Sequence, residues 1–315
     1  MNQPNDIFAI ERTAQMTINK IPEFPRFSEI HCDFYTEIHD VLLKEQPEIS
    51  EHSLGFIYGY RRSLKLSICK LNNNLILKGF YDGHNLIVSP IGREKIPQTV
   101  ALCAKYIKEN LKTGRIGAIP KAAAMELKSH GFNPLPDRDD FDYIYSVKEL
   151  INLTGDKFHA KKNLVNGFIK RYSFEFKPLD SVLIPECLQL HQKWCDLKAC
   201  TQDPSSNAED LMVVELLNNF SHWKLFGGAI LIDGKVQAFT ILEELNCTTA
   251  VGHVEKANTE YRGIYQAINQ FAAKKLLSKY EFVNREQDVG EPGLRKAKLS
   301  YNPVGFAEKY YIEIL

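Results

Sequence analysis

The sequence predicts an α/β (α+β) fold made of two similar halves, each a mixed, mostly antiparallel sheet flanked by helices. Two observations carry this prediction. The order strand, turn, strand, strand, helix, strand, helix, strand occurs twice along the chain. The length of 315 residues also exceeds that of a usual single domain, so two domains are expected.

The first half begins with a helix over residues 34–44, followed by three strand-like runs that are joined by the turn formers LNNN and Asp82-Gly83. A helix over 98–112 then places Val100, Ala104 and Ile107 on one face, as expected of a helix that packs on a sheet. The three strand-like runs cover residues 64–70, 74–81 and 85–92. Strands at 115–120 and 142–147 and a helix at 121–129 complete this half.

The second half repeats this order from residue 227. Its first hairpin turns at Asp233-Gly234, which is the strongest two-residue hairpin signal in the chain. A strand over 248–257, a helix over 263–278, a strand over 280–286, a short helix over 293–298 and a final strand over 306–314 follow. Residues 150–219 between the halves are mostly helical in pattern, with one strand at 172–179.

We therefore predict an N-terminal domain over residues 1–148 and a C-terminal domain over residues 149–315. The halves show no similarity residue by residue, so the repeat is one of architecture only. The charged segments described below are concentrated in the second half, and we expect the active site there.

Composition excludes several classes of protein. The formal net charge is +0, which gives no general attraction to polyanions, although a local basic patch can still bind phosphates. The seven cysteines are scattered and form no CxxC pair, so we expect free thiols in a reducing compartment and no metal site. Residues 1–15 lack a secretion signal, and no apolar run is long enough to span a membrane, so a cytoplasmic location is predicted.

Arg262 and Gly263 mark a possible anion site at the start of the helix over 263–278. The N-terminus of a helix presents unpaired N–H groups and a partial positive charge, and glycine permits close approach of a ligand. We therefore count both residues among those that bind the phosphates of a ligand.

Several separated blocks resemble the DUF2156 family, which is related to the C-terminal domain of phosphatidylglycerol lysyltransferases. The blocks are SLGFIYGYRR, DYIYSVKELINLTGDKFHAKKN, VEKANTEYRGIYQAINQF and, longest and most specific, NREQDVGEPGLRKAKLSY. The resemblance covers most of the chain and implies two GNAT-like (Gcn5-related N-acetyltransferase) domains in tandem. It also implies transfer of an acyl or aminoacyl group to an amine or hydroxyl. The membrane-spanning half of the lysyltransferases has no counterpart here, which puts a lipid acceptor in doubt.

Acyl transfer requires a base for the incoming nucleophile and donors for the developing oxyanion. His253 and Glu255 lie on one face of the strand over 248–257, where they could form a base and its orienting partner. Tyr261 could supply a hydroxyl acid. The structural alternative is a hydrogen-bonded pair on the sheet surface and a packed aromatic ring.

The segment NREQDVGEPGLRKAKLSY mixes acids and bases around a turn set by Gly290, Pro292 and Gly293. We count Glu286 and Asp288 as catalytic, because a substrate amine needs carboxylates. Arg295 and Lys298 share a helix face that could clamp a phosphate chain. A salt-bridged turn beside a solvated basic helix is the structural alternative. The other residues assigned to donor binding are Lys157, Lys161, Lys256, Asn284, Arg285 and Lys296.

The function predicted is an acyltransferase of the tandem GNAT type that takes an aminoacyl group from aminoacyl-tRNA, with tRNA as partner and no tightly bound cofactor. One alternative is an acyl-CoA-dependent N-acetyltransferase acting on a small amine, although YRGIY retains only one Arg-Gly step of the usual donor signature. The other is a ligand-binding protein without chemistry. No Walker A, G-x-S-x-G or H-E-x-x-H motif occurs, which disfavours phosphoryl transfer, serine hydrolysis and zinc proteolysis.

Overall fold

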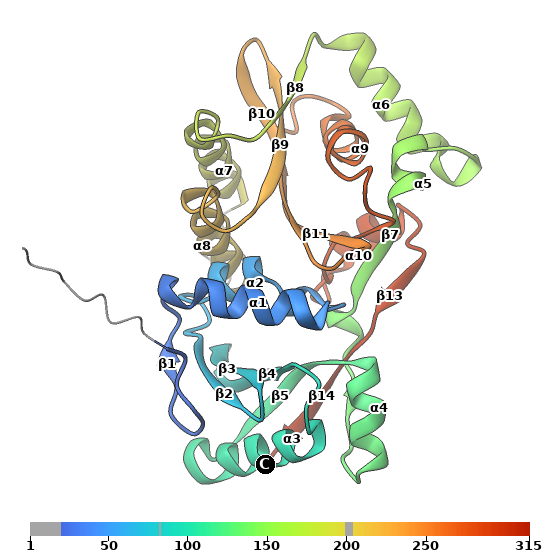
Figure 1. The fold of residues 1–315 in the computed structure, drawn as a ribbon. Helices are drawn as coiled ribbons and strands as arrows, with labels where there is room; N and C mark the ends of the chain where they lie inside the picture. The colour runs from blue at the N-terminus through green and yellow to red at the C-terminus, as the bar shows by residue number, and fades with distance from the viewer. Residues whose placement is uncertain (1–19, 82, 199–203) are drawn as a thin grey trace, which may run out of the picture.

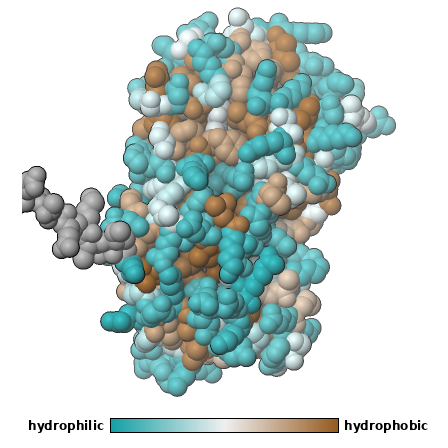
Figure 2. Space-filling model, viewed as in Figure 1, coloured by the Kyte–Doolittle hydropathy of each residue, from teal (hydrophilic) through white to brown (hydrophobic). Residues whose placement is uncertain are grey.

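The computed structural model describes residues 20–81, 83–198 and 204–315, which form two seven-stranded sheets placed one beyond the other along the molecule (Figure 1). Residues 1–15, which carried the prediction about secretion, and Cys200 lie outside the described residues. No helix in the described ranges is long and apolar enough to cross a membrane. Hydrophilic residues cover much of the face seen in Figure 2, with hydrophobic residues between them over both sheets.

The first sheet is a meander that continues into one parallel pair. Strands β2 (Ser67–Leu71), β3 (Asn74–Tyr81) and β4 (His84–Ile91) are antiparallel neighbours, and β4 runs parallel to β5 (Gly114–Pro120) over only three residue pairs. Helix α3 (Ile96–Tyr106) connects β4 to β5 and is extended by a π-helical turn, Ile107–Leu111. The order of the sheet is β1 (Ser28–Glu29), β2, β3, β4, β5, β14 (Lys309–Ile314) and β6 (Leu135–Pro136).

The second sheet has the same plan. Its hairpin joins β9 (Phe226–Ile232) to β10 (Lys235–Glu244) through Asp233 and Gly234, which both have positive φ as this tight turn requires. Strand β11 (Thr249–Ala257) is parallel to β12 (Phe282–Asn284) only at residues 249–251, and α9 (Ile264–Leu276) connects them. The order is β13 (Gly305–Ala307), β7 (Asp142–Ser146), β12, β11, β10, β9 and β8 (Glu175–Pro178).

The two sheets exchange strands. Strand β7, from the first half of the sequence, lies between β13 and β12 of the second sheet, and the C-terminal β14 lies between β5 and β6 of the first sheet. In Figure 1 the red end of the chain accordingly returns to the blue and green sheet. The division at residues 148 and 149 stays a prediction, but the sheets themselves cross it.

Helices near the start of the chain lie between the two sheets (Figure 1) and pack against both halves. Helices α1 (Tyr35–Glu45) and α2 (Leu54–Gly59) lie between the sheets in Figure 1. One hydrophobic cluster runs from Tyr58 on α2 to Trp223 and Phe239 of the second half, so the halves share a core. The other helices are α4 (Lys121–Ser129), α5 (Val147–Asn152), α6 (His159–Arg171), α7 (Ile184–Lys198), α8 (Pro204–Asn218) and α10 (Pro292–Leu299).

Candidate active site

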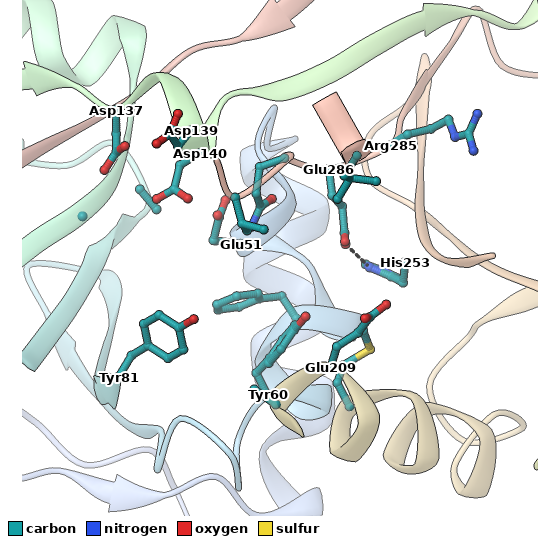
Figure 3. A pocket seen from close by; sticks show the side chains of 18 of the residues that line it. Glu51, Tyr60, Tyr81, Asp137, Asp139, Asp140, Glu209, His253, Arg285 and Glu286 are labelled. Atoms are coloured by element: carbon teal, nitrogen blue, oxygen red, sulfur yellow. Dashed lines mark hydrogen bonds and ion pairs between the residues drawn. The ribbon is translucent and has the colours of Figure 1, made fainter. Parts of the chain in front are cut away.

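A pocket of about 1030 Å³ lies between the two sheets and is lined by residues from both halves. Figure 3 shows carboxylates entering it from opposite sides, with Asp137, Asp139 and Asp140 facing Glu286 and Glu209 across Glu51 and two tyrosines. Carboxylates outnumber the basic residues in this wall. The acids are Glu51, Asp137, Asp139, Asp140, Glu209, Glu255, Glu286 and Glu313, and the lysines and arginines are Arg115, Lys161, Arg285 and Lys298.

His253 is held between two carboxylates. Its Nδ1 is 2.8 Å from Glu286 Oε1 and its Nε2 is 3.0 Å from Glu243 Oε2. Burial disfavours the charged ring, but the hydrogen bonds and charges of Glu243 and Glu286 outweigh it and raise the pKa of His253 to about 10. His253 is therefore an imidazolium with both nitrogens occupied. The expected pairing of His253 with Glu255 is wrong, because Glu286 and Glu243 occupy the two ring nitrogens, and the role of His253 as a base stays a prediction.

Glu243 links this histidine to the first half of the chain. Its two carboxylate oxygens accept hydrogen bonds from the backbone nitrogens of Leu54 (2.9 Å) and Gly55 (2.7 Å), in the first turn of α2. A Cβ on Gly55 would overlap the His253 ring, so glycine is required for this contact. The His253–Glu243 pair thus fixes α2 against the second sheet.

Glu255 pairs with Arg285 across the opening between β11 and β12. The guanidinium donates to Glu255 Oε1 at 3.1 Å, and Asn269 donates to Oε2 at 3.3 Å. Arg285 also lies 5.6 Å and 5.1 Å from the ring centres of Tyr145 and Tyr301. This pair lies where the two parallel strands separate, and both of its residues line the pocket.

Lys298 fixes the loop that carries Arg285 and Glu286. Its ammonium donates to the backbone carbonyls of Arg285 (2.6 Å), Glu286 (3.0 Å) and Gln287 (2.5 Å), which uses its three N–H groups. Burial lowers the pKa of Lys298 to about 8, a shift that Glu286 opposes and the charge of Arg285 assists. Glu286 has a φ of 56°, so these hydrogen bonds stabilise a strained turn.

Asp288 and Arg295 form a second, structural cluster outside the pocket lining. Asp288 is fully buried and accepts from Tyr143 (2.5 Å), from the Gly290 nitrogen (3.0 Å) and from Arg295 (2.6 and 2.9 Å). Despite burial, these bonds lower the pKa of Asp288 to about 2. Arg295 also binds Asp139 at 2.7 Å. The predicted phosphate clamp of Arg295 and Lys298 is therefore not formed, and Asp288 is a packing carboxylate.

The helix start at Gly263 packs against α6. A Cβ on Gly263, whose φ is 91°, would lie 2.5 Å from the Leu164 carbonyl oxygen, and Arg262 is exposed to solvent. Tyr261 makes an edge contact with Tyr172 at 5.2 Å between ring centres. Contrary to the prediction, these three residues lie outside the pocket lining, because α6 covers this end of α9.

The other residues assigned to donor binding are dispersed. Lys256 is buried over the Trp194 ring and binds Glu209 at 2.8 Å, so it supports the pocket wall from behind. Lys161 lines the pocket, bound to Ser300 at 2.7 Å. The remaining three lie outside the lining: Lys157 binds Glu149, Lys296 is exposed, and Asn284 is buried against Asp142.

A buried ionic cluster at the boundary of the two halves was not predicted from the sequence. Lys309 of β14 lies 2.6 Å from Glu51 and 2.6 Å from Asp142. Burial raises the pKa of Glu51 to about 7, because it outweighs the attraction of Lys309. Burial likewise raises the pKa of Asp140, beside this cluster, to about 6. Sequence offered no signal for this cluster, because Glu51 and Lys309 are 258 residues apart.

Residues 44–313 match the family described as phosphatidylglycerol lysyltransferase, C-terminal. The chain belongs to this family. An uncharacterised protein of Mycoplasmoides gallisepticum is 23% identical over 177 residues, which span 55% of this chain and 56% of that protein, so the chain spans about half the length of this curated relative.

Solved structures show the same fold. A conserved protein of unknown function from Bacteroides thetaiotaomicron is 29% identical, with a TM-score of 0.85 over 92% of this chain and 99% of that one. The structure of L-PGS from Bacillus licheniformis has a TM-score of 0.64 at 13% identity, over 93% of each chain. FemX has a TM-score of 0.55 at 9% identity, over 91% of this chain and 96% of its own. The predicted family and the tandem GNAT-like fold class are confirmed.

Proposed function

We propose that this protein is an aminoacyltransferase that transfers an aminoacyl group from aminoacyl-tRNA to an amine or hydroxyl in the pocket between the two sheets. The observation that carries the proposal is the excess of carboxylates in that pocket. Membership of the phosphatidylglycerol lysyltransferase C-terminal family and the likeness in fold to FemX support the class of reaction.

An aminoacyl ester fits this wall better than an acetyl thioester does. Its α-ammonium group is a cation, and a buried cation requires carboxylate partners. Asp140 lies beside Glu51 on the first-half side of the pocket, and burial raises the pKa of Asp140 to about 6, as expected of a carboxylate that is short of positive partners. A bound ammonium would supply the missing positive charge.

The reaction needs a group that accepts a proton near neutral pH, and we assign this role to Glu51. The acceptor nitrogen or oxygen attacks the ester carbonyl, the acceptor's proton moves to the Glu51 carboxylate, and the ester bond to the tRNA breaks. The departing tRNA oxygen takes that proton from Glu51 and becomes a hydroxyl, so the carboxylate is restored. A base with a pKa of about 7 suits this exchange. Arg285, one of whose five N–H groups is on Glu255, supplies donors to the carbonyl oxygen.

An acyl-CoA donor is the weaker alternative. A pyrophosphate would be expected at a helix N-terminus, but α6 packs on the start of α9 in the second half. A charged tRNA as donor would agree with the cytoplasmic location predicted from the sequence.

The decisive experiment is a transfer assay with purified protein, labelled aminoacyl-tRNAs and a panel of small amines and hydroxyl compounds. We expect acceptor-dependent loss of label from tRNA, slowed at least about 100-fold in E51Q and unchanged in E126Q, a control at an exposed glutamate on α4. A saturable thermal shift with acetyl-CoA and no transfer from tRNA would favour the acyl-CoA alternative. If neither aminoacyl transfer nor a thermal shift with acetyl-CoA is observed, the ligand-binding alternative remains.

A further inference from the structure

A separate polar cluster, distinct from those around Asp288 and Lys309, lies between helices α7 and α8. It consists of His191 and Cys195, which are one turn apart on α7, and Asp210 on α8. His191 and Cys195 are buried, while the Asp210 side chain remains 24% exposed. The cluster therefore combines a nitrogen, a sulfur and an oxygen ligand with a path to solvent.

The distances within the cluster fit one face of a metal tetrahedron. His191 Nε2 and Asp210 Oδ1 are 2.8 Å apart, Cys195 Sγ is 3.3 Å from that oxygen, and Sγ is 3.8 Å from that nitrogen. Tetrahedral zinc with ordinary bond lengths separates nitrogen from oxygen by about 3.3 Å and either of them from sulfur by about 3.5 Å. Side-chain movements of about half an ångström would complete such a face.

The protein itself does not satisfy all the polar atoms of this cluster. His191 Nδ1 is buried without a hydrogen-bond partner in the part of the chain that the structure describes. Nδ1 is the ring nitrogen turned away from Asp210 and Cys195, so it is not a ligand; it would keep the proton when Nε2 binds an ion, with a water as its acceptor. The nearest cation, Lys256, is already bound to Glu209 and stacked on Trp194, so it does not compete for Asp210.

We propose that His191, Cys195 and Asp210 bind a zinc-type divalent metal ion. Mixed nitrogen, thiolate and carboxylate ligands favour Zn²⁺ over Mg²⁺ or Ca²⁺. Binding displaces the thiol proton of Cys195, and water completes the fourth position. The ion would cross-link α7 to α8 beside Glu209, which lines the pocket. It would therefore hold one carboxylate of the pocket wall in place, whatever reaction occurs there.

The proposal is tested with the full chain freed of metal by chelator and titrated with Zn²⁺ and, separately, Co²⁺. We expect one Zn²⁺ per chain, a rise in Tm, and a Co²⁺ spectrum with a thiolate charge-transfer band and tetrahedral d–d bands. In C195S and D210N the affinity should fall at least about 100-fold, because even the loss of an outer-shell partner costs 10–100-fold. C247S and D196N, at exposed positions, are the matched controls and should keep the wild-type affinity.

Two results would overturn the site: no saturable Zn²⁺ binding by the wild-type chain, or wild-type affinity in both C195S and D210N. Circular dichroism identifies a variant that fails to fold. In that case the wild-type and C247S Co²⁺ spectra decide, since a spectrum without thiolate ligation excludes Cys195 as a ligand. These readouts do not depend on transfer activity.

Discussion

Two buried cations, Lys309 and His253, each lie between two carboxylates at the boundary of the halves, yet their surroundings differ. Lys309 binds Glu51 and Asp142, and His253 binds Glu243 and Glu286. Burial and the negative groups nearby raise the pKa of Glu51 to about 7. The carboxylates raise the pKa of both cations against the effect of burial, that of Lys309 above its usual range and that of His253 to about 10. The same arrangement thus gives a carboxylate that can exchange protons near pH 7 and a histidine that stays charged.

The two clusters differ in burial and in the charges nearby. Burial is the main cause of the raised pKa of Glu51, and the negative charges of Asp142 and Asp140 add to it. Glu243, by contrast, also accepts hydrogen bonds from two backbone N–H groups of α2. The comparison indicates that the Lys309 cluster suits chemistry and the His253 cluster suits structure.

Replacing Lys309 should cost the most stability. K309M leaves Asp142 and Glu51 buried without their cation, and breaking a buried pair in this way costs about 3–5 kcal/mol. Urea unfolding measures the change, with K296M as the control on an exposed lysine, for which a change within about 0.5 kcal/mol is expected. Equal effects of the two variants would show that Lys309 is not held as described.

Replacing His253 should remove a contribution to stability that depends on pH. H253Q keeps one hydrogen bond but loses the charge, and we expect a loss of about 3 kcal/mol at pH 6. Because the folded pKa of His253 is raised to about 10, its contribution is complete below the unfolded value of about 6.5 and is lost as pH rises through 10. The difference between wild type and H253Q should therefore shrink from pH 6 to pH 10 in urea unfolding. A constant difference would contradict the raised pKa.

E51Q should lower aminoacyl transfer by at least about 100-fold, which corresponds to about 2.7 kcal/mol, since a general base contributes 10²–10⁴-fold. The wild-type rate should rise with pH through about 7, where Glu51 loses its proton, and this rise should be absent from the residual activity of E51Q. A pH profile unchanged by the substitution would assign the base elsewhere. The measurement is the initial rate of label transfer from pH 5.5 to pH 8.5.

G55A should have the smallest effect, about 1–3 kcal/mol of destabilisation, because the added methyl group overlaps the His253 ring. Gly293 in α10 is the matched control. A Cβ there meets no atom within 4 Å, so G293A should be neutral or stabilising by up to about 1 kcal/mol. Thermal unfolding of both variants measures the difference, and equal destabilisation would contradict the close packing of α2 on His253.

Local patterns in the sequence predicted most of the individual elements. The helix expected over 121–129 occurs at those residues, and the helix expected over 263–278 spans Ile264–Leu276. Helix α8 was covered only by the expectation that 150–219 is mostly helical, because its apolar residues are not confined to one face. Strand exchange was not expected, since periodicity predicts that a strand forms and not which neighbour it pairs with.

The candidate site was predicted by region more than by role. His253, Glu255, Glu286, Arg285, Lys298 and Lys161 all line the pocket, and their functional roles stay predictions. The predicted pairings failed because alternation along β11 indicates which side chains share a face but not what packs against that face. Glu243 and Glu286 reach His253 from β10 and from the loop after β12, so only their relative placement made the contact.

The sequence by itself determined the order of elements, the repeated two-sheet plan and the family, because turns, periodicity and motif spacing are properties of neighbouring residues. Tertiary structure decided which charges meet. Glu51 lies 258 residues from Lys309, and Leu54 lies 189 residues from the Glu243 that caps it. Such contacts follow from how β7 and β14 exchange between the sheets and how α2 is buried between them. Burial then sets each pKa, and neither partner's local sequence contains that information.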